Sequence, residues 1–253
     1  MVVRSEMLSV VVPLFDGKRF GIPHTTGVYD GEWVNKLYRG LARNTTRAFE
    51  LVVLVDRHYD DITEPVRQVP FLIQDNNTTA GWTVLIEMYR PDIVPAGQRR
   101  MTTGLDTIIC NNIDQIMDWD EDVGLISDPF FPNDVCNGIS IVSSAISEQI
   151  WNIWMTKQDW VMENCLLPPW NVPSEMVLMR KCFNANNECP RIDHYYPGLI
   201  YSYKVHILAN PKLMDTAAIV YFHGKYKQHQ LGTYNDFYSK IPTVDKVLKE
   251  HWV

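Results

Sequence analysis

Continuous apolar runs alternate with an amphipathic stretch at the start of the chain. Residues 7–15 are rich in Val and Leu and lead into Asp16, and residues 49–56 form a similar run that ends in Asp56. Both runs predict strands that are buried on two faces. Between them, residues 31–45 place apolar side chains at helical spacing, which predicts an amphipathic helix. The order strand, helix, strand indicates a parallel βαβ unit.

The rest of the chain continues this alternation less regularly. We expect further strands at residues 66–73, 99–110, 137–144 and 217–224. We expect helices at residues 80–93, where Pro91 stops the pattern, and at 114–119, 146–165, 174–182 and in a polar tail from residue 243.

These elements predict an α/β fold with a mostly parallel central sheet flanked by helices. A chain of 253 residues is long enough for one such domain with a substantial core. We therefore treat residues 1–253 as one domain, with a regular half over 7–135 and a more irregular half over 136–240. Ligands of open parallel sheets lie beyond the carboxyl ends of the strands, so strand ends are the places to look for chemistry.

Asp106 is the first candidate, because it lies inside the apolar stretch "RRMTTGLDTIICNN". A strand-end Asp commonly caps the turn that follows, and for an isolated Asp this is the simpler interpretation. The alternative is a metal ligand, since hard divalent cations prefer oxygen ligands and often bridge to substrate phosphates. Asp16, Asp56 and His223 also fall at or near predicted strand ends.

Two further polar stretches border predicted strands. "YFHGKYKQH" is either a surface turn or a phosphate clamp, in which His223 faces a metal, Gly224 allows close approach, and Lys225 and Lys227 neutralise oxygens. "CNGISIV" begins a strand with Asn137, whose amide either belongs to a turn or binds sugar hydroxyls.

The composition limits the functions that the protein can have and the cellular compartment in which we expect it. The net charge of −7 and a pI near 5.5 disfavour a general nucleic-acid binder. Five cysteines without CxxC spacing favour a reducing compartment, although Cys182 and Cys189 could pair in a secreted protein. The apolar run near the N-terminus is too short to span a bilayer. We therefore expect a cytoplasmic protein that is soluble or peripheral to a membrane, with no transmembrane segment.

Several stretches resemble glycosyltransferases of the GT-A fold that use nucleotide sugars. "GLDTIICNNIDQI" is similar to the element "DLDTVIVGNLDEL", and "IVYFHGKYKQH" is similar to "IVCFHGKPKPH". "YPGLIYSYK" is similar to "YPGKIVSYK", and further likeness covers residues 32–56 and 81–99. The matching segments follow the same order over residues 7–232, which indicates the GT-A fold, with likeness to family 8 and to viral and bacterial glycosyltransferases. The resemblance implies a nucleotide-binding half over 7–135 and a sugar- and acceptor-binding half over 136–240.

The resemblance implies transfer of a sugar from a UDP- or GDP-linked donor to a glycan-type acceptor hydroxyl. It implies that Asp106 and His223 bind Mn²⁺ or Mg²⁺, which stabilises the leaving diphosphate. Lys227 would assist as a catalytic residue, and Glu175 would face the donor sugar. The remaining implied donor-binding residues are Val12, Pro13, Leu14, Asp56, Thr107, Asn137, Gly138, Gly224 and Lys225.

The sequence departs from the family pattern at three positions of the donor site. Gly104 stands where the family has the first Asp of its carboxylate motif, Leu85 replaces a Lys, and Glu175-Met176 replaces an Asp-Gln pair. The interpretations that remain are an active enzyme with altered metal or donor use, or a degenerate GT-A module that binds nucleotide sugar or glycan.

Two further alternatives follow from the same residues. A metal-independent transferase could use Arg99, Arg100, Lys225 and Lys227 in place of the cation. A nucleotidyltransferase would need a Gly-rich basic loop after the first strand, and "FDGKRFG" is only a faint match.

Overall fold

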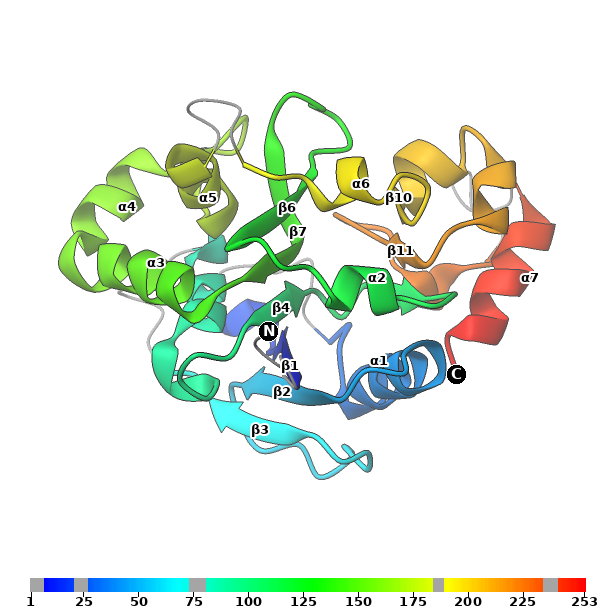
Figure 1. Ribbon diagram of the computed structural model, residues 1–253, viewed down its shortest axis with the longest axis horizontal. Helices are drawn as coiled ribbons and strands as arrows, with labels where there is room; N and C mark the ends of the chain where they lie inside the picture. Colours follow the sequence, from blue (N-terminus) through cyan, green and yellow to red (C-terminus); the bar gives the residue numbers. More distant parts are fainter. Residues whose placement is uncertain (1–6, 21–26, 73–80, 184–188, 234–240) are drawn as a thin grey trace, which may run out of the picture.

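A six-stranded sheet forms the centre of the computed structural model, which describes residues 7–20, 27–72, 81–183, 189–233 and 241–253 (Figure 1). The strand order is β3-β2-β1-β4-β7-β6. The first four run parallel, and β7 and β6 complete the sheet with antiparallel pairings. The strands are β1 (Leu8–Leu14), β2 (Phe49–Val55), β3 (Arg67–Pro70), β4 (Arg100–Thr103), β6 (Val123–Ser127) and β7 (Val135–Val142). The predicted α/β fold class is confirmed.

The predicted βαβ unit is formed by β1, α1 (Gly31–Asn44) and β2. The helix begins at Asp30, whose side chain accepts a hydrogen bond from the backbone N–H of Trp33 at 3.3 Å. Its apolar face packs in a core cluster that includes Val10 and Val53. Alternate residues of the same strands, such as Val52, pack in a second cluster on the other face of the sheet. Burial of both faces explains why β1 and β2 are continuous apolar runs.

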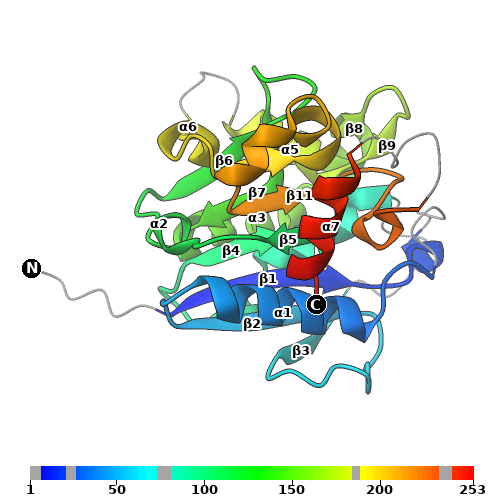
Figure 2. The ribbon, with the colours of Figure 1, turned by 90° about the vertical axis from the view of Figure 1, so that its right-hand side faces the viewer.

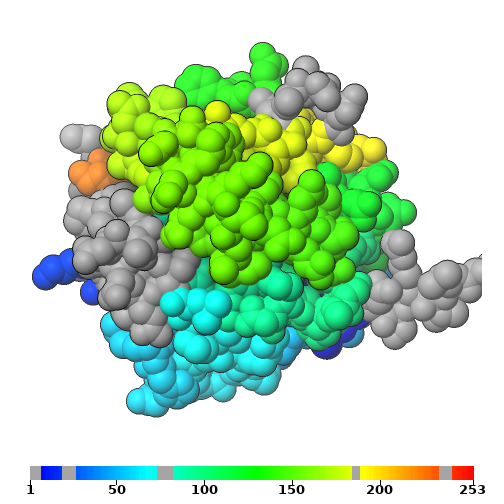
Figure 3. Space-filling model, turned by 90° about the vertical axis from the view of Figure 1, so that its left-hand side faces the viewer, coloured from blue at the N-terminus to red at the C-terminus, as the bar shows by residue number. Residues whose placement is uncertain are grey.

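Helices α3 (Ser144–Thr156), α4 (Gln158–Asn164) and α5 (Glu175–Phe183) lie on one side of the molecule (Figure 1). The space-filling view shows α3 and α4, in yellow-green, above the cyan segment that contains β3 (Figure 3). The prediction of one helix over residues 146–165 is wrong, because Lys157 adopts φ −138° and separates α3 from α4. The predicted helix at residues 80–93 forms two 3₁₀ helices instead, η3 (Gly81–Tyr89) and η4 (Pro91–Ile93).

A smaller sheet of three strands, in the order β10-β11-β5, corrects another prediction. The stretch 99–110 is not one strand: β4 ends at Thr103, and β5 (Thr107–Ile109) pairs antiparallel with β11 (Ile219–Tyr221) in the smaller sheet. β10 (Ile200–Ser202) pairs in parallel with β11. Residues 104–106 therefore connect two sheets, and Asp106 lies in the connection rather than inside a strand.

The remaining elements cover the smaller sheet and the periphery. They are α2 (Asp114–Met117), α6 (Ile192–Tyr195), α7 (Pro242–His251), the hairpin β8 (Leu166–Leu167) and β9 (Val172–Pro173), η1 (Gly17–Phe20), the π-helical turn η5 (Tyr203–Ile207), η6 (Pro211–Asp215) and η7 (Gln228–Gln230). The predicted helices at 114–119, at 174–182 and in the tail are confirmed, while β6, β8, β9 and β10 were not anticipated. The expected element ends at residues 73, 80 and 240 lie outside the described residues.

Helix α7, drawn in red, closes the smaller sheet (Figure 2). Its residues Val244 and Leu248 pack in a third core cluster with Ile108 and Val220. The hydroxyl of buried Tyr203 donates a hydrogen bond to Asp245 at 2.5 Å. Within the described part of the chain, no helix combines the length and the apolar character needed to cross a bilayer.

Candidate functional site

The connection at residues 104–106 follows the carboxyl end of β4, at the edge of the sheet where β1 also ends. The segment after β11 holds it in place. The backbone N–H of Phe222 donates to the carbonyl of Asp106 at 2.7 Å, and the side-chain amide of Gln228 donates to the carbonyl of Leu105 at 2.8 Å. The two motifs recognised in the sequence are therefore joined by hydrogen bonds at one place.

An ion pair joins Lys227 to Asp106 across 121 positions of sequence. The ammonium group contacts Oδ2 of Asp106 and donates a second hydrogen bond to the carbonyl of Phe222 at 3.0 Å. The Lys227 side chain is 8% exposed and that of Asp106 is 21% exposed. Because a buried ammonium needs an opposite charge or carbonyl oxygens, these contacts fix both side chains at the site.

His223 follows β11 and lies beside the same pair. Its Nε2 is 2.8 Å from Oγ of Ser202, and its ring makes an edge contact with Phe130 at 4.9 Å between centroids. Burial and the charge of Lys204 lower the pKa of His223 to about 4, against an opposing effect of Asp106. The imidazole is therefore neutral at pH 7.

Lys204 brings a second ammonium group to the site. It comes from η5, and its Nζ contacts the carbonyl oxygen of His223. Burial and the neighbouring charge of Lys227 lower its pKa to about 8, while Asp106 acts in the opposite direction. At pH 7 the cluster of Asp106, Lys204, Lys227 and His223 thus carries two positive charges and one negative charge. We call these four residues the lysine cluster.

The Asp106 carboxylate, in the position it has here, leaves no room for a side chain at residue 104, so this residue is glycine. A Cβ atom placed on residue 104 would lie 2.3 Å from Oδ1 of Asp106. Oδ1 belongs to a movable side chain, so a larger residue at 104 would displace the carboxylate rather than the backbone. The departure from the family motif is therefore coupled to the orientation in which Asp106 meets Lys227.

We expect Gly104→Ala to weaken binding of a nucleoside diphosphate at least about tenfold, because the displaced carboxylate no longer orients Lys227. The cost in unfolding free energy should be only about 1 kcal/mol, since one side chain moves. Calorimetric titration with UDP or GDP and urea unfolding measure the two quantities. Gly40→Ala is the control, because its Cβ would meet only ordinary contacts from 3.4 Å outward. Unchanged binding in Gly104→Ala would contradict the prediction.

Asn137 and Glu175 lie together in a buried position at the start of β7 and α5. The amide nitrogen of Asn137 donates to Oε1 of Glu175 at 3.3 Å, and the hydroxyl of Ser174 lies 3.4 Å from Oε2. Burial raises the pKa of Glu175 to about 7, and the hydrogen bond from Asn137 opposes the shift. Glu175 therefore exchanges a proton near neutral pH.

The hydroxyl of Thr103, at the end of β4, links β5 to β7. Oγ1 of Thr103 lies 3.0 Å from Oγ1 of Thr107 and donates to the carbonyl of Gly138 at 3.2 Å. Two of the predicted donor-binding residues, Thr107 and Gly138, therefore share the partner Thr103.

The predicted base-binding residues lie at the same edge of the sheet without a described contact to the lysine cluster. Val12 and Leu14 are fully buried in the core, so only their backbone and the half-buried Pro13 can face a base. The carboxylate of Asp56 accepts hydrogen bonds from the Tyr59 hydroxyl at 2.9 Å and the Asp16 backbone at 3.2 Å. Their role in base recognition stays a prediction.

The arginine pair proposed from the sequence lies away from this site. Arg100 begins β4, at the opposite end from Asp106, and donates from Nη1 to the carbonyls of Met88 and Arg90, both at 2.8 Å. Its side chain is buried, and Arg99 precedes it. Arg100 therefore anchors η3 to the sheet and does not face the lysine cluster.

The structure adds four residues that sequence reasoning missed: Lys204, Ser202, Tyr29 and Phe130. The ring of Tyr29 lies 6.0 Å from Nζ of Lys227, and burial together with the Asp106 charge raises its pKa. Phe130 is 62% exposed although it touches His223. The two consecutive aromatic residues at 130–131, in a polar loop, were the sequence signal that could have indicated Phe130. Lys204 belongs to the segment "YPGLIYSYK", which was recognised in the sequence without a role for the lysine.

The donor set does not fit a resident divalent cation. Two carboxylates lie near His223, and both are engaged by cationic side chains: Asp106 by Lys227, and Asp128 by Arg180 at 2.6 Å. Gly104 supplies no further carboxylate. Across the described ranges, no three His, Cys, Asp or Glu side chains gather as metal ligands. Binding of Mn²⁺ or Mg²⁺ stays a prediction from the resemblance.

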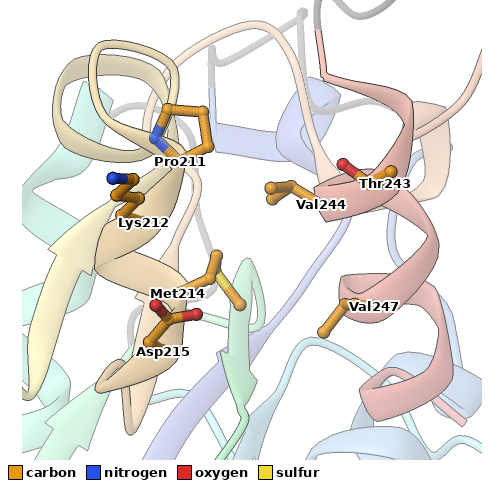
Figure 4. Close-up of a pocket in the computed structure, with 7 residues that line it drawn as sticks. All are labelled: Pro211, Lys212, Met214, Asp215, Thr243, Val244 and Val247. Carbon is orange, nitrogen blue, oxygen red and sulfur yellow. The ribbon is translucent and has the colours of Figure 1, made fainter.

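A hollow of about 290 Å³ lies between η6 and α7 (Figure 4). It is lined by Pro211, Lys212, Met214, Asp215, Thr243, Val244 and Val247. It shares no residue with the lysine cluster, so it carries no part of the site described above.

Comparison with known proteins places the fold. The apo glycosyltransferase GlyE of Streptococcus pneumoniae TIGR4 superposes with a TM-score of 0.59 and 11% identity, over 98% of this chain and 60% of GlyE. The galactosyltransferase LgtC, in complex with donor and acceptor sugar analogs, gives 0.55 and 8%, over 97% of both chains. The bifunctional glycosyltransferase WbbM gives 0.59 and 11%, over 99% of this chain and 52% of WbbM.

The two sequence comparisons found no relative: no family model and no curated protein matches this chain. At such low identity, the structural likeness shows the fold alone. The chain has the GT-A fold that its motifs predicted, and it spans about 60% of the length of GlyE.

Proposed function

We propose that this protein is a glycosyltransferase that moves a sugar from a nucleoside diphosphate sugar to an acceptor hydroxyl. The carrying observation is the lysine cluster at the carboxyl edge of a GT-A sheet, where ligands of open parallel sheets bind. Two ammonium groups against one carboxylate form a seat for an anion. A diphosphate is the anion that such a donor presents.

The reaction breaks the bond between the anomeric carbon and the diphosphate oxygen, and negative charge develops on the leaving diphosphate. Lys227 and Lys204 are placed to stabilise that charge, because they are fixed before the reaction by Asp106 and by carbonyl oxygens. Asn137 and Glu175 supply amide and carboxyl groups for the hydroxyls of the donor sugar. The acceptor hydroxyl oxygen forms the new bond to the anomeric carbon, and its proton passes to the leaving diphosphate.

The donor is UDP- or GDP-linked and the acceptor is of glycan type in this proposal. The donor and acceptor sugar analogs in the LgtC complex support a sugar donor and a sugar acceptor. Gly104 and the engaged Asp106 also favour a second candidate, a GT-A module that binds nucleotide sugar or glycan without turnover.

The test is release of nucleoside diphosphate from a panel of UDP- and GDP-sugars, with EDTA and with Mn²⁺. We expect at least slow hydrolysis of one donor, and a loss of about tenfold or more in Asp106→Asn, which weakens the hold on Lys227. Asp118→Asn is the matched control, because Asp118 is a half-exposed carboxylate paired with Arg47 on the surface. Donor binding without any release would favour the binding module, and absence of both would overturn both candidates.

A further inference from the structure

We propose that the ammonium groups of Lys204 and Lys227 take the place of a divalent cation at the donor diphosphate, so that this site binds its donor without metal. This inference rests on the proposed function, because it assumes a nucleoside diphosphate as the ligand. It differs from the metal-independent arrangement suggested by the sequence, since the arginines lie elsewhere.

The carboxylate oxygens of the site are poorly placed to bind a divalent cation. A divalent cation at this place needs oxygen ligands that are free to coordinate it. Residue 104 has no side chain, and Oδ1 of Asp106 occupies the space in which a side chain at 104 would begin. Oδ2 of the same carboxylate is bound by the ammonium of Lys227. Oδ2 of Asp106 is therefore engaged by an ammonium group, and Oδ1 lies where the side chain of a second acidic residue at 104 would begin.

The buried ammonium group of Lys227 favours an anion at this place. Lys227 is 6% exposed, and its ammonium is held between the Asp106 carboxylate and the carbonyl of Phe222. A divalent cation bound to Asp106 would stand next to this ammonium and be repelled by it. A diphosphate oxygen at the same place would be attracted, so the fixed charges select an anion over a cation.

Lys204 lies where a ligand can reach it from solvent. The ammonium of Lys204 contacts the carbonyl of His223 and lies beside the exposed turn at Gly224, where an added Cβ would come within 3.7 Å of Nζ. Gly224 adopts φ +68°, a conformation that keeps this turn free of a side chain. Lys204 thus places a half-buried charge beside this exposed turn and near the buried Lys227, so that the two ammonium groups face successive phosphoryl groups in our proposal.

The experiment is calorimetric titration of the full chain with UDP, GDP and pyrophosphate, in EDTA and in Mn²⁺. We expect dissociation constants that differ by less than about threefold between the two conditions. Lys204→Met should weaken binding about tenfold or more in EDTA, because a charge-assisted contact is lost. Lys246→Met is the control, since Lys246 is 79% exposed on α7 and pairs with the exposed Glu250 at 3.9 Å. Lys204→Gln and a thermal melt of each variant separate loss of binding from loss of folding.

The outcomes distinguish this inference from the proposed function. Binding in EDTA that Lys204→Met weakens about tenfold or more supports it. Binding that appears only with Mn²⁺, or that Lys204→Met leaves unchanged, overturns it, while donor turnover in Mn²⁺ would keep the transferase intact. No binding of any of the three probes in either condition overturns it as well, and absence of donor turnover would then overturn the proposed function separately.

Discussion

Lys227→Met is expected to lower the free energy of unfolding by about 2–4 kcal/mol and to abolish binding of UDP or GDP. The substitution keeps the length and the apolar stem of the side chain, so the effect reports the ammonium group. Asp106 would lose its charged partner, and the carbonyl of Phe222 would lose a donor in a buried place. Because the Asp106 side chain remains 21% exposed, water offsets part of the cost. Urea unfolding and calorimetric titration measure the two effects.

A double-mutant cycle tests the origin of this loss. Asp106→Asn combined with Lys227→Met should cost less than the sum of the single substitutions, because neither partner is then left alone. Lys246→Met should change stability by no more than about 0.5 kcal/mol, since its ion pair with Glu250 is exposed and 3.9 Å long. If Lys227→Met were as mild as this control, the ion pair would not be holding the connection between the two sheets.

The part of the fold with buried strands was predictable from the sequence. Val10, Val52 and Leu54 are buried on one face or the other of the sheet, so β1 and β2 are apolar without interruption and leave little ambiguity. The intervening helix carried its own start signal in Asp30. Local pattern and tertiary burial agree over these residues.

The break between β4 and β5 was not predictable in the same way. Thr103, Leu105 and Thr107 are buried and alternate with half-buried residues at 104 and 106, as the residues of a single strand would. What separates the strands is a pairing of Ile109 with Ile219, far away in sequence. A local pattern holds no information about such a partner, so the sequence suggested one long strand.

The site was predictable to the extent that its motifs resemble those of a family. Asp106, His223 and Lys227 were found in this way, and the structure brings them together. Lys204 was not found, because its role depends on the reach of a side chain from η5 to the carbonyl of His223. Arg100 was overvalued for the opposite reason: its charge suggested a ligand, whereas its guanidinium binds backbone carbonyls.

The raised pKa of Glu175 should make the stability of the protein depend strongly on pH. The side chain is buried, and its hydrogen bonds come from Asn137 and Ser174 rather than from a positively charged group. Burial therefore dominates and raises the pKa to about 7 in the folded protein. In the unfolded chain the carboxyl group titrates near its ordinary value of about 4.3. Between these values the folded state holds a proton that the unfolded state has lost.

We therefore expect the stability of the protein to fall as the pH rises from about 4 through about 7, by about 4 kcal/mol from this group alone. The sign follows because a carboxyl group with a raised folded pKa favours folding below its unfolded pKa and loses that contribution as it ionises. Glu175→Gln removes the titration while keeping size and hydrogen bonding, so its urea midpoint should gain on the wild type between pH 4.5 and 8. Glu121→Gln, at an exposed position, should follow the wild type across this range. An equal difference between Glu175→Gln and wild type at both pH values would mean that Glu175 ionises in the folded protein without a cost of burial.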